Sequence, residues 1–223
     1  QVQRFSDIDL NDSFFDSLRA SYPEFNEWYN KKAAAGATAY CYYVDNELKD
    51  FLYLKIEEEE LSDLTPVLPA KKRLKVGTFK VDNDNRHTTR GERFMKKIMD
   101  MAIAEDVDEI YVTMFPTEEL QGLIRMFEKF GFSHIADKPH EGGNAEYVLI
   151  KDMTTHVDDF KLDYPFVKKA SSNKYVLSIV PKFHTHLFPD SILKNEKKYD
   201  LIQDVSETNS IYKIYVCWMQ DTR

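Results

Sequence analysis

Cysteine, glycine and proline are all scarce in this chain. Its 223 residues include only Cys41 and Cys217, together with 7 glycines and 8 prolines. Two cysteines so far apart exclude a disulfide framework and lack the spacing of a metal-binding motif. We therefore expect two buried reduced thiols and predict no metal site. The low glycine and proline content excludes long flexible or collagen-like segments.

Long hydrophobic runs are absent from the sequence as well. No stretch approaches the roughly 18 apolar residues that a membrane-spanning helix requires, and the N-terminus lacks a basic region followed by an apolar one. We expect a cytoplasmic protein without a membrane partner. What is present is the composition of a globular protein, with 43% apolar and 13% aromatic residues, in a chain long enough for one large domain or two smaller ones.

The negative charge is confined to the first two-thirds of the chain. Residues 1–153 contain 20 Lys and Arg against 29 Asp and Glu, a net charge of −9, whereas residues 154–223 contain 10 against 9, a net charge of +1. An acidic first part disfavours nonspecific nucleic-acid binding and suits a cationic amine substrate.

The first part of the chain predicts one or two helices and then a hairpin. Pro23 separates the two helices, and Asp12 or Ser13 caps the first one. Strand-like runs at 38–44 and 51–56 flank a polar turn at 45–47 and predict an antiparallel hairpin. The helices share an aromatic face that is more typical of a core than of a ligand channel, formed by Phe14, Phe15, Leu18, Tyr22, Phe25 and Trp28.

An acidic run at 57–60 follows the hairpin. Like charges side by side favour a solvated run, although a carboxylate there could act as a general base on an amine. A proline-containing loop is expected at 61–71.

A strand, a charged turn and a helix occupy the centre of the chain. Residues 74–81 alternate as a strand, with Leu74, Val76, Thr78 and Lys80 predicted on one face and Lys75, Gly77, Phe79 and Val81 on the other. A glycine inside a strand often marks a bulge or the close approach of a ligand. From Gly91 the apolar residues recur every 3.6 positions, which predicts a helix with one buried face. The start of that helix, with its free backbone N–H groups, is suited to bind an anion.

The following segments complete a sheet. A parallel-type strand is expected at 109–115, a helix at 118–130 with Gly131 as its C-terminal cap, and closing strands at 132–136 and 146–151 around a turn at 141–144.

Four sequence blocks, in this order, resemble the GNAT family of N-acetyltransferases. They are KVGTFKV, RGERFMKKIMDMA, EIYVTMF and RMFEKFGF, beginning at residues 75, 90, 109 and 125. The resemblance covers residues 1–153. It implies an α/β (α+β) fold with a mixed, mostly antiparallel sheet, a central parallel strand pair and flanking helices, and it implies acetyl-CoA as cofactor and an amine, small or on a protein, as acceptor.

The resemblance also places the cofactor at the turn before the central helix. In the family this turn carries Gln or Arg, later Gly, and then Gly or Ala, and its N–H groups hold the pyrophosphate. Arg90 takes the first place, but Arg93 and Met95 replace the two small residues. Either Arg93 adds a charged contact to the phosphate, or its side chain crowds the site. The implied cofactor-binding residues are Phe79, Lys80, Val81, Arg86, Arg90, Gly91, Glu92, Arg93, Phe94 and Met95. Alternatively, the arginines pair with Asp82, Asp84 and Glu92 on the surface.

The proton donor of the family is missing. Leu120 and Phe127 stand where many members have Asn and a proton-donating Tyr, and neither can donate a proton. Tyr147 and the run at 57–60 are conceivable substitutes, and the catalytic residues stay unassigned. Two functions remain open: an N-acetyltransferase using direct attack, or a noncatalytic module that senses acyl-CoA or binds RNA or protein.

Residues 154–223 form a β-rich segment that weakly resembles the start of a PUA-like domain. Because it ends in a strand-like run, we expect the natural protein to continue. His184 and His186 alternate but lack a third metal ligand. Nucleic acid is a conceivable partner only for this segment, through aromatic and basic residues such as Lys182, Phe183, Lys213 and Tyr215, although packing against residues 1–153 is the simpler role.

Overall fold

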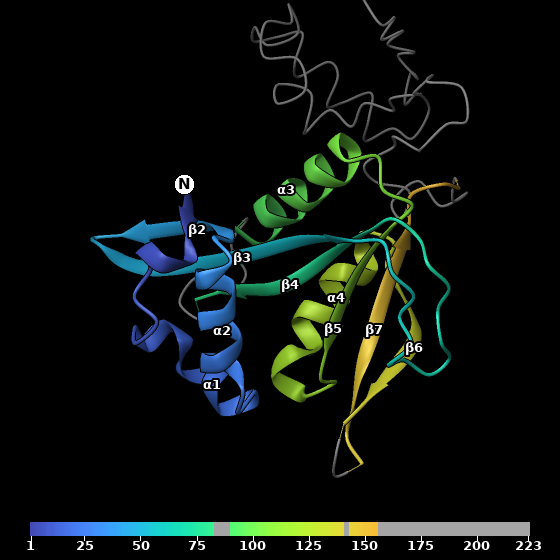
Figure 1. The fold of residues 1–223 in the computed structure, drawn as a ribbon, viewed down its shortest axis with the longest axis horizontal. Coiled ribbons are helices and arrows are strands. Elements are labelled where there is room, and N and C mark those ends of the chain that lie inside the picture. The colour runs from blue at the N-terminus through green and yellow to red at the C-terminus, as the bar shows by residue number, and fades with distance from the viewer. Residues whose placement is uncertain (83–89, 141–142, 156–223) are drawn as a thin grey trace, which may run out of the picture.

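A computed structural model describes residues 1–82, 90–140 and 143–155 of the chain. They form one seven-stranded sheet of order β1-β2-β3-β4-β5-β7-β6, shown in Figure 1. The strands are β1 (Val2–Arg4), β2 (Thr38–Val44), β3 (Glu47–Glu57), β4 (Arg73–Val81), β5 (Glu109–Met114), β6 (Ser133–Pro139) and β7 (Ala145–Asp152). The α-helices are α1 (Asp16–Ser21), α2 (Phe25–Ala34), α3 (Arg90–Ala104) and α4 (Gln121–Lys129), and short 3₁₀ turns are η1 (Phe5–Asp7), η2 (Ser13–Phe15) and η4 (Glu118–Leu120).

The strand directions confirm the predicted mixed sheet. The β4–β5 pair is parallel, and the other neighbouring pairs of the described sheet are antiparallel. No helix in the described part of the chain is long and apolar enough to cross a membrane. The segment 154–223, including His184, His186 and Cys217, lies outside the described residues except for its first two positions.

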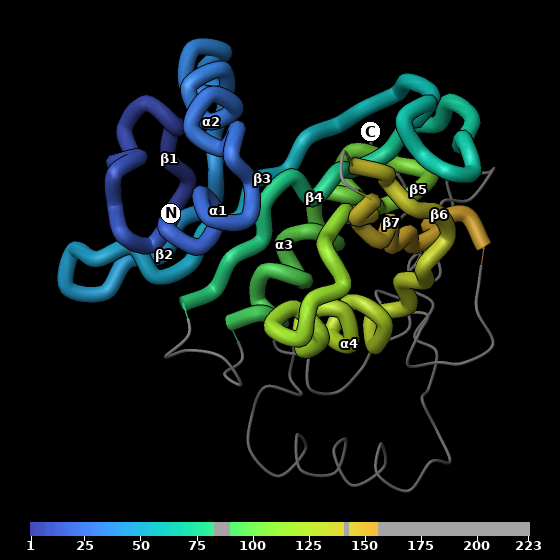
Figure 2. Tube along the Cα trace, turned by 90° about the horizontal axis from the view of Figure 1, so that it is seen from below, coloured from blue at the N-terminus to red at the C-terminus, as the bar shows by residue number. Residues whose placement is uncertain are grey.

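The two faces of the sheet are covered differently, as Figure 2 shows. Helices α3 and α4 cover what we call the helix face, where Leu74, Ile98, Ile110, Phe127 and Leu149 are among the fully buried residues of one apolar core. Helices α1 and α2 and the loop 58–72 cover the other side, which we call the opposite face. The sequence therefore builds two layers around a single sheet: the helix face buries one apolar cluster, and the opposite face buries one under α1 and α2 and another under the loop.

The layer of α1 and α2 confirms the predicted aromatic core. Phe14, Phe15 and Phe25 are buried against β2 and β3. Asp12 caps the preceding turn by accepting a hydrogen bond from the Phe14 N–H at 2.8 Å. Cys41 is buried in the same cluster, as predicted, and burial raises the pKa of its thiol to about 11.

The parallel strands β4 and β5 separate after a short paired stretch. Their register runs from Arg73 opposite Glu109 to Val76 opposite Val112, and the second half of β4 has no described partner on that side. In Figure 1 the second half of β4 runs to the left while β5 runs downward. Within the described part of the chain, this divergence leaves one edge of β4 without a neighbouring strand just before α3 begins.

A β-bulge at Gly77 corrects the predicted side-chain alternation of β4. Thr78 pairs with Tyr53 and Val76 pairs with Leu54, so Gly77 is an extra residue on β4. The extra residue reverses the alternation: Phe79 and Val81, not Thr78 and Lys80, lie with Leu74 and Val76 against the helix-face core. A Cβ atom at Gly77 would lie 2.6 Å from Cδ1 of Tyr53, which explains the glycine.

Smaller differences between the prediction and the structure concern the ends of helices and strands. The hairpin turn is Asp45–Asn46, both with positive φ, and β3 begins at Glu47 rather than at residue 51. Helix α4 ends as predicted, because Gly131 has a φ of +83° and the Phe132 N–H donates to the Phe127 carbonyl. The segment between β3 and β4 was predicted to be a loop. In the structure it forms isolated β-bridges, such as that between Thr65 and Asp137, and no strand.

Candidate functional site

The predicted cofactor site centres on the end of β4 and the start of α3. Phe79 faces α3 and α4, where its ring lies 5.5 Å from that of Phe94 and 5.6 Å from that of Phe127. Phe94 and Met95 are buried in the helix-face core. Their side chains therefore support the site as an apolar floor, and only their backbone groups remain to contact an anion.

Lys80 points away from this floor. Its ammonium donates to the Phe14 carbonyl and to Oγ of Ser17, and it lies 4.7 Å from the centre of the Phe14 ring. Because the bulge turns Lys80 to the opposite face, its side chain ties β4 to α1 instead of extending along β4 toward α3. Val81, opposite Asp50 on β3, ends the strand.

Arg90, the first residue of α3, is folded back onto the neighbouring strands. Its guanidinium lies 3.6 Å from the Asp50 carboxylate and 4.4 Å from the centre of the Tyr42 ring. Asp50 is buried, and burial raises the pKa of this carboxyl although Arg90 partly offsets the effect. Arg90 therefore has a structural partner, Asp50, which is different from the partners expected from the sequence, and Asp82 pairs with Lys49 at 3.2 Å.

The remaining predicted residues surround the first turn of α3. A Cβ atom at Gly91 would lie 2.8 Å from Sδ of Met126 on α4, so the glycine permits close contact between the two helices. Glu92 and Arg93 are exposed. The Arg93 side chain thus lies on the surface of the helix and does not fill the space between β4 and α3. Arg86 lies outside the described residues.

This region fits a ligand with an extended polar arm and an anionic group. The second half of β4 offers backbone groups that no strand of the described sheet occupies on the β5 side. The first turn of α3 offers backbone N–H groups that have no acceptor within the helix itself, and Arg93 in this turn is exposed. The packed rings of Phe79 and Phe94 lie between the edge of β4 and the first turn of α3.

The helix face also carries the two positions where a proton donor is missing. Leu120 ends the turn η4, and Phe127 is fully buried in α4 with its ring 4.9 Å from that of Phe132. Tyr147 on β7 is half-buried, packs against the same core and stacks on the His134 ring with centroids 4.0 Å apart. Among the described residues named for proton donation, Tyr147 is the phenol on this face.

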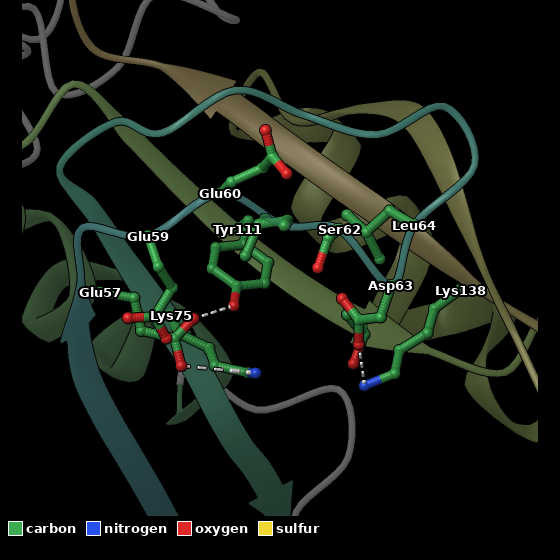
Figure 3. A pocket seen from close by; sticks show the side chains of 11 residues that line it. Glu57, Glu59, Glu60, Ser62, Asp63, Leu64, Lys75, Tyr111 and Lys138 are labelled. Atoms are coloured by element: carbon green, nitrogen blue, oxygen red, sulfur yellow. Dashed lines mark hydrogen bonds and ion pairs between the residues drawn. The ribbon is translucent and has the colours of Figure 1, made fainter.

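The opposite face contains a polar cavity beneath the loop 58–72, shown in Figure 3. Glu57, Lys75 and Tyr111 lie at one end of the cavity, and Asp63 and Lys138 form an ion pair of 3.0 Å at the other. The lining is completed by Glu59, Glu60, Leu61, Ser62, Leu64 and Thr113.

Glu57 is the most constrained carboxylate of this cavity. It is buried, accepts a hydrogen bond from the Tyr111 hydroxyl, and lies 3.0 Å from Lys55 and 3.6 Å from Lys75. Burial opposes its ionisation, but Tyr111 and the two lysines outweigh burial and lower the pKa of Glu57. The expectation of a solvated run therefore fails at Glu57, because the strand β3 carries it under the loop, and holds for Glu58, Glu59 and Glu60, which are exposed.

A buried ion pair anchors the strands beside the cavity. Nε of Arg73, which is 1% exposed, donates to the Glu109 carboxylate at 2.7 Å across the β4–β5 pair. The same guanidinium donates to the Pro69 carbonyl at 2.8 Å, and Lys71 also contacts Glu109. The network holds both the parallel pair and the loop above it.

A second cluster of polar residues lies on the same face, near the end of β5. Glu146, which is 4% exposed, accepts hydrogen bonds from the Tyr22 hydroxyl at 2.8 Å and from Nε2 of His140 at 3.0 Å. The Phe115 ring lies 5.6 Å from Tyr22 and 5.1 Å from His140. Burial, followed by the Glu146 charge, raises the pKa of the Tyr22 phenol. The group joins α1 to the β6–β7 hairpin.

Sequence reasoning missed this group and most of the cavity. Tyr22 is 124 residues from Glu146 in the chain, and only the packing of α1 brings it to the β6–β7 hairpin that carries His140 and Glu146. Strand alternation could have placed Lys75 and Tyr111 on one face, but not the loop above them.

The chain matches no protein-family model, and no curated protein matches its sequence. Several solved structures have a similar fold. An aminoglycoside 6'-N-acetyltransferase complexed with coenzyme A is 13% identical over 71% of this chain and 99% of its own, with a TM-score of 0.46. NAA60 of Arabidopsis thaliana, with a bisubstrate analogue, is 14% identical over 68% and 98%, with a TM-score of 0.46. A GNAT family acetyltransferase of Elizabethkingia anophelis with acetyl-CoA bound is 12% identical over 68% and 97%, with a TM-score of 0.45. At these values the function has to be inferred from the residues of this chain.

Proposed function

We propose that the chain is an acetyl-CoA-dependent N-acetyltransferase that transfers an acetyl group to an amine by direct attack. The observation that carries the proposal is the separation of β4 and β5 after Val76 and Val112. It leaves a strand edge directly before the start of α3, in the element order that the sequence blocks share with the GNAT family. A cofactor that lies between the strands is accessible to an acceptor from the opposite face.

The residues that would hold the cofactor lie on β4 and α3. The backbone of Phe79, Lys80 and Val81 would pair with the amide-containing arm, and the first-turn N–H groups of α3 would bind the pyrophosphate, with Arg93 adding a charged contact. Bound acetyl-CoA supplies an activated thioester. In this arrangement Arg90 positions the start of the helix through Asp50, because its guanidinium is held on β3.

Two groups of this chain are suited to move protons. We infer that Glu146 and His140 take up the proton that the amine loses, because both lie on the opposite face near the end of β5. Tyr147 lies on the helix face and is the candidate that returns a proton to the leaving thiolate. Positioning of the amine supplies a further part of the rate enhancement.

The burial of Phe127 favours a second candidate function. At this position the ring is part of the core and offers no proton. A chain that binds acyl-CoA without transferring the acyl group would be a sensor, and residues 154–223, which we treat as a separate C-terminal unit, would then engage a protein or RNA partner. In either case we expect a cytoplasmic location.

Calorimetric titration with acetyl-CoA, followed by thioester consumption over a panel of amines, tests the proposal. We expect binding at roughly micromolar concentration and consumption with at least one amine. Arg93→Glu should weaken binding about tenfold, whereas Lys97→Glu, an exposed charge reversal one turn further along α3, should have little effect. Binding without consumption favours the sensor, and absence of binding at roughly tens of micromolar contradicts both.

A further inference from the structure

Glu146 lies on β7 next to Tyr147, which forms the last pair of the β5–β7 ladder with Met114. Successive residues of a strand point to opposite faces of a sheet. Glu146 accordingly contacts Tyr22 of α1 on the opposite face, whereas Tyr147 packs against the helix-face core. The groups that we assign to proton uptake and proton return are therefore supplied from the two sides of one strand.

The polar residues of this cluster differ in how far solvent can reach them. The Glu146 side chain is 5% exposed, whereas that of His140 is 35% exposed. Both Glu146 oxygens are also engaged, because Oε1 accepts from the Tyr22 hydroxyl at 2.8 Å and Oε2 lies 3.0 Å from Nε2 of His140. An amine that approaches from the opposite face can therefore reach the His140 ring but not the carboxylate behind it.

The contact with Glu146 decides which nitrogen of the His140 ring carries the proton. An ionised carboxylate accepts hydrogen bonds and cannot donate one. Nε2 of His140 therefore has to be protonated in order to donate to Glu146. A neutral imidazole carries one proton, so the lone pair is left on Nδ1. Within the described part of the chain, the hydrogen bonds of this ring involve Nε2 and not Nδ1.

The surroundings hold this ring and its carboxylate in place. The Phe115 ring packs on both sides of the cluster, 5.6 Å from the Tyr22 ring and 5.1 Å from the His140 ring. Tyr22 keeps its proton and stays a donor to Glu146, since burial and the Glu146 charge raise the pKa of its phenol. A carboxylate fixed behind a histidine selects one tautomer and stabilises the imidazolium that forms when the outer nitrogen takes up a proton.

We propose that Nδ1 of His140 is the base of the transfer, and that Glu146 and Tyr22 are positioning residues that fix the tautomer and orientation of its ring. The inference rests on the proposed function and assigns the proton uptake to one atom. Nδ1 accepts one proton from the neutral amine as the amine nitrogen forms its bond to the acetyl carbon. The carbon–sulfur bond breaks, and Tyr147 donates one proton to the departing sulfur. Proton exchange with water then returns both side chains to their starting forms.

Nitrogen-15 nuclear magnetic resonance of the histidine rings tests this assignment on the full chain, without acetyl-CoA or an amine. At a pH where the ring is neutral, His140 should have a protonated Nε2 and an unprotonated Nδ1. Glu146→Gln should give a mixture of the two tautomers, because a side-chain amide can either donate or accept. A protonated Nδ1 in the original chain, or a single unchanged tautomer in Glu146→Gln, would overturn the proposal.

A matched pair of tyrosine variants tests the positioning role in the transfer reaction. Tyr22→Phe removes the hydroxyl that holds Glu146 and should lower kcat about tenfold while KM changes little. Tyr43→Phe removes a hydroxyl of the same layer that donates to Oε1 of Gln3 at 2.8 Å, and it should leave kcat unchanged. Equal values of kcat in the two variants would contradict the role of Tyr22.

Chemical rescue tests the base itself. His140→Ala should lower kcat roughly 100-fold, and added imidazole should restore part of the loss, which it would not do if the ring only supported the fold. An unchanged kcat, or a loss that imidazole does not reduce, would overturn the assignment of His140.

Failure of this inference can be told apart from failure of the proposed function. If amines are acetylated but His140→Ala is as active as the original chain, the base is misassigned and the transferase proposal stands. If acetyl-CoA binds and no amine is acetylated, the transferase proposal fails, and the base assignment fails with it whatever tautomer the ring adopts.

Discussion

The two faces of the β4–β5 strand pair differ in what they bury. The helix face buries an apolar core in which the Phe79 ring contacts those of Phe94 and Phe127. The opposite face buries charged residues of β3, β4 and β5, namely Glu57, Arg73 and Glu109. Adjacent residues of one strand thus contribute to two environments of opposite character.

The two faces therefore differ in the groups that they can offer a ligand. The helix face offers a ligand backbone groups and an apolar floor, whereas the opposite face offers ionised groups in fixed positions. Buried charges weaken a fold unless each has a partner, and those of the cavity and of the Arg73–Glu109 network are paired.

The largest effect is expected from removing the central cation of the opposite face. Arg73→Met leaves the Glu109 carboxylate in a buried site with Lys71 as its remaining partner among the described residues, so the free energy of unfolding should fall by about 3–5 kcal/mol. Urea unfolding of the original chain and the variant measures this difference in the free energy of unfolding. A loss below about 1 kcal/mol, the value typical of exposed pairs, would show that this network is solvated and would break the contrast between the faces.

Introducing a tyrosine at position 127, on the helix face, should lower the free energy of unfolding and should not create activity. In Phe127→Tyr the new hydroxyl is buried against Phe79 and Phe132, so the free energy of unfolding should fall by about 1–3 kcal/mol. Phe130→Tyr, at the half-buried end of α4, is the control and should be nearly neutral. A stable Phe127→Tyr chain with faster thioester consumption would mean that the helix face has room for a proton donor.

A smaller effect is expected where a single hydroxyl is removed from the cavity floor. Tyr111→Phe deletes the hydrogen bond to Glu57 and should lower the free energy of unfolding by about 1–2 kcal/mol at neutral pH. The lowered pKa of Glu57 stabilises the fold above the usual carboxyl pKa, and this contribution is lost as the pH falls. The variant should therefore lose less stability on acidification than the original chain. Identical acid dependence in both would rule out this role of Tyr111.

The smallest effect concerns Cys41, in the aromatic layer of the opposite face. Because burial raises the pKa of its thiol to about 11, the neutral thiol stabilises the fold at and below the usual thiol pKa, and this stability is lost as the pH rises. Between pH 8 and 10 the loss should be about 1 kcal/mol. Measuring the free energy of unfolding against pH for Cys217→Ser and for Cys41→Ala/Cys217→Ser isolates the contribution of Cys41, because the tyrosines titrate in both variants. Parallel pH curves would contradict a buried thiol.

The order of elements was predictable because it depends on local patterns. The 3.6-residue spacing from Gly91 predicted α3, and Gly131 predicted the end of α4. Gly77 was a signal for the bulge that the structure shows, but the faces of β4 beyond it were predicted wrongly, because the alternation was continued through the glycine and the bulge is set by pairing with β3. Likewise, the partner of Arg90 is a residue of β3, and the contact of Tyr22 with Glu146 arises only when the sheet is assembled.

Hydrogen exchange of the full chain with and without acetyl-CoA tests the central claim most directly, because it locates the ligand on the backbone. We predict slower exchange at the amides from Gly77 to Val81 and in the first turn of α3, with little change in β1 and β2. Protection confined to other elements, or no protection at saturating acetyl-CoA, would contradict the placement of the cofactor between β4 and β5.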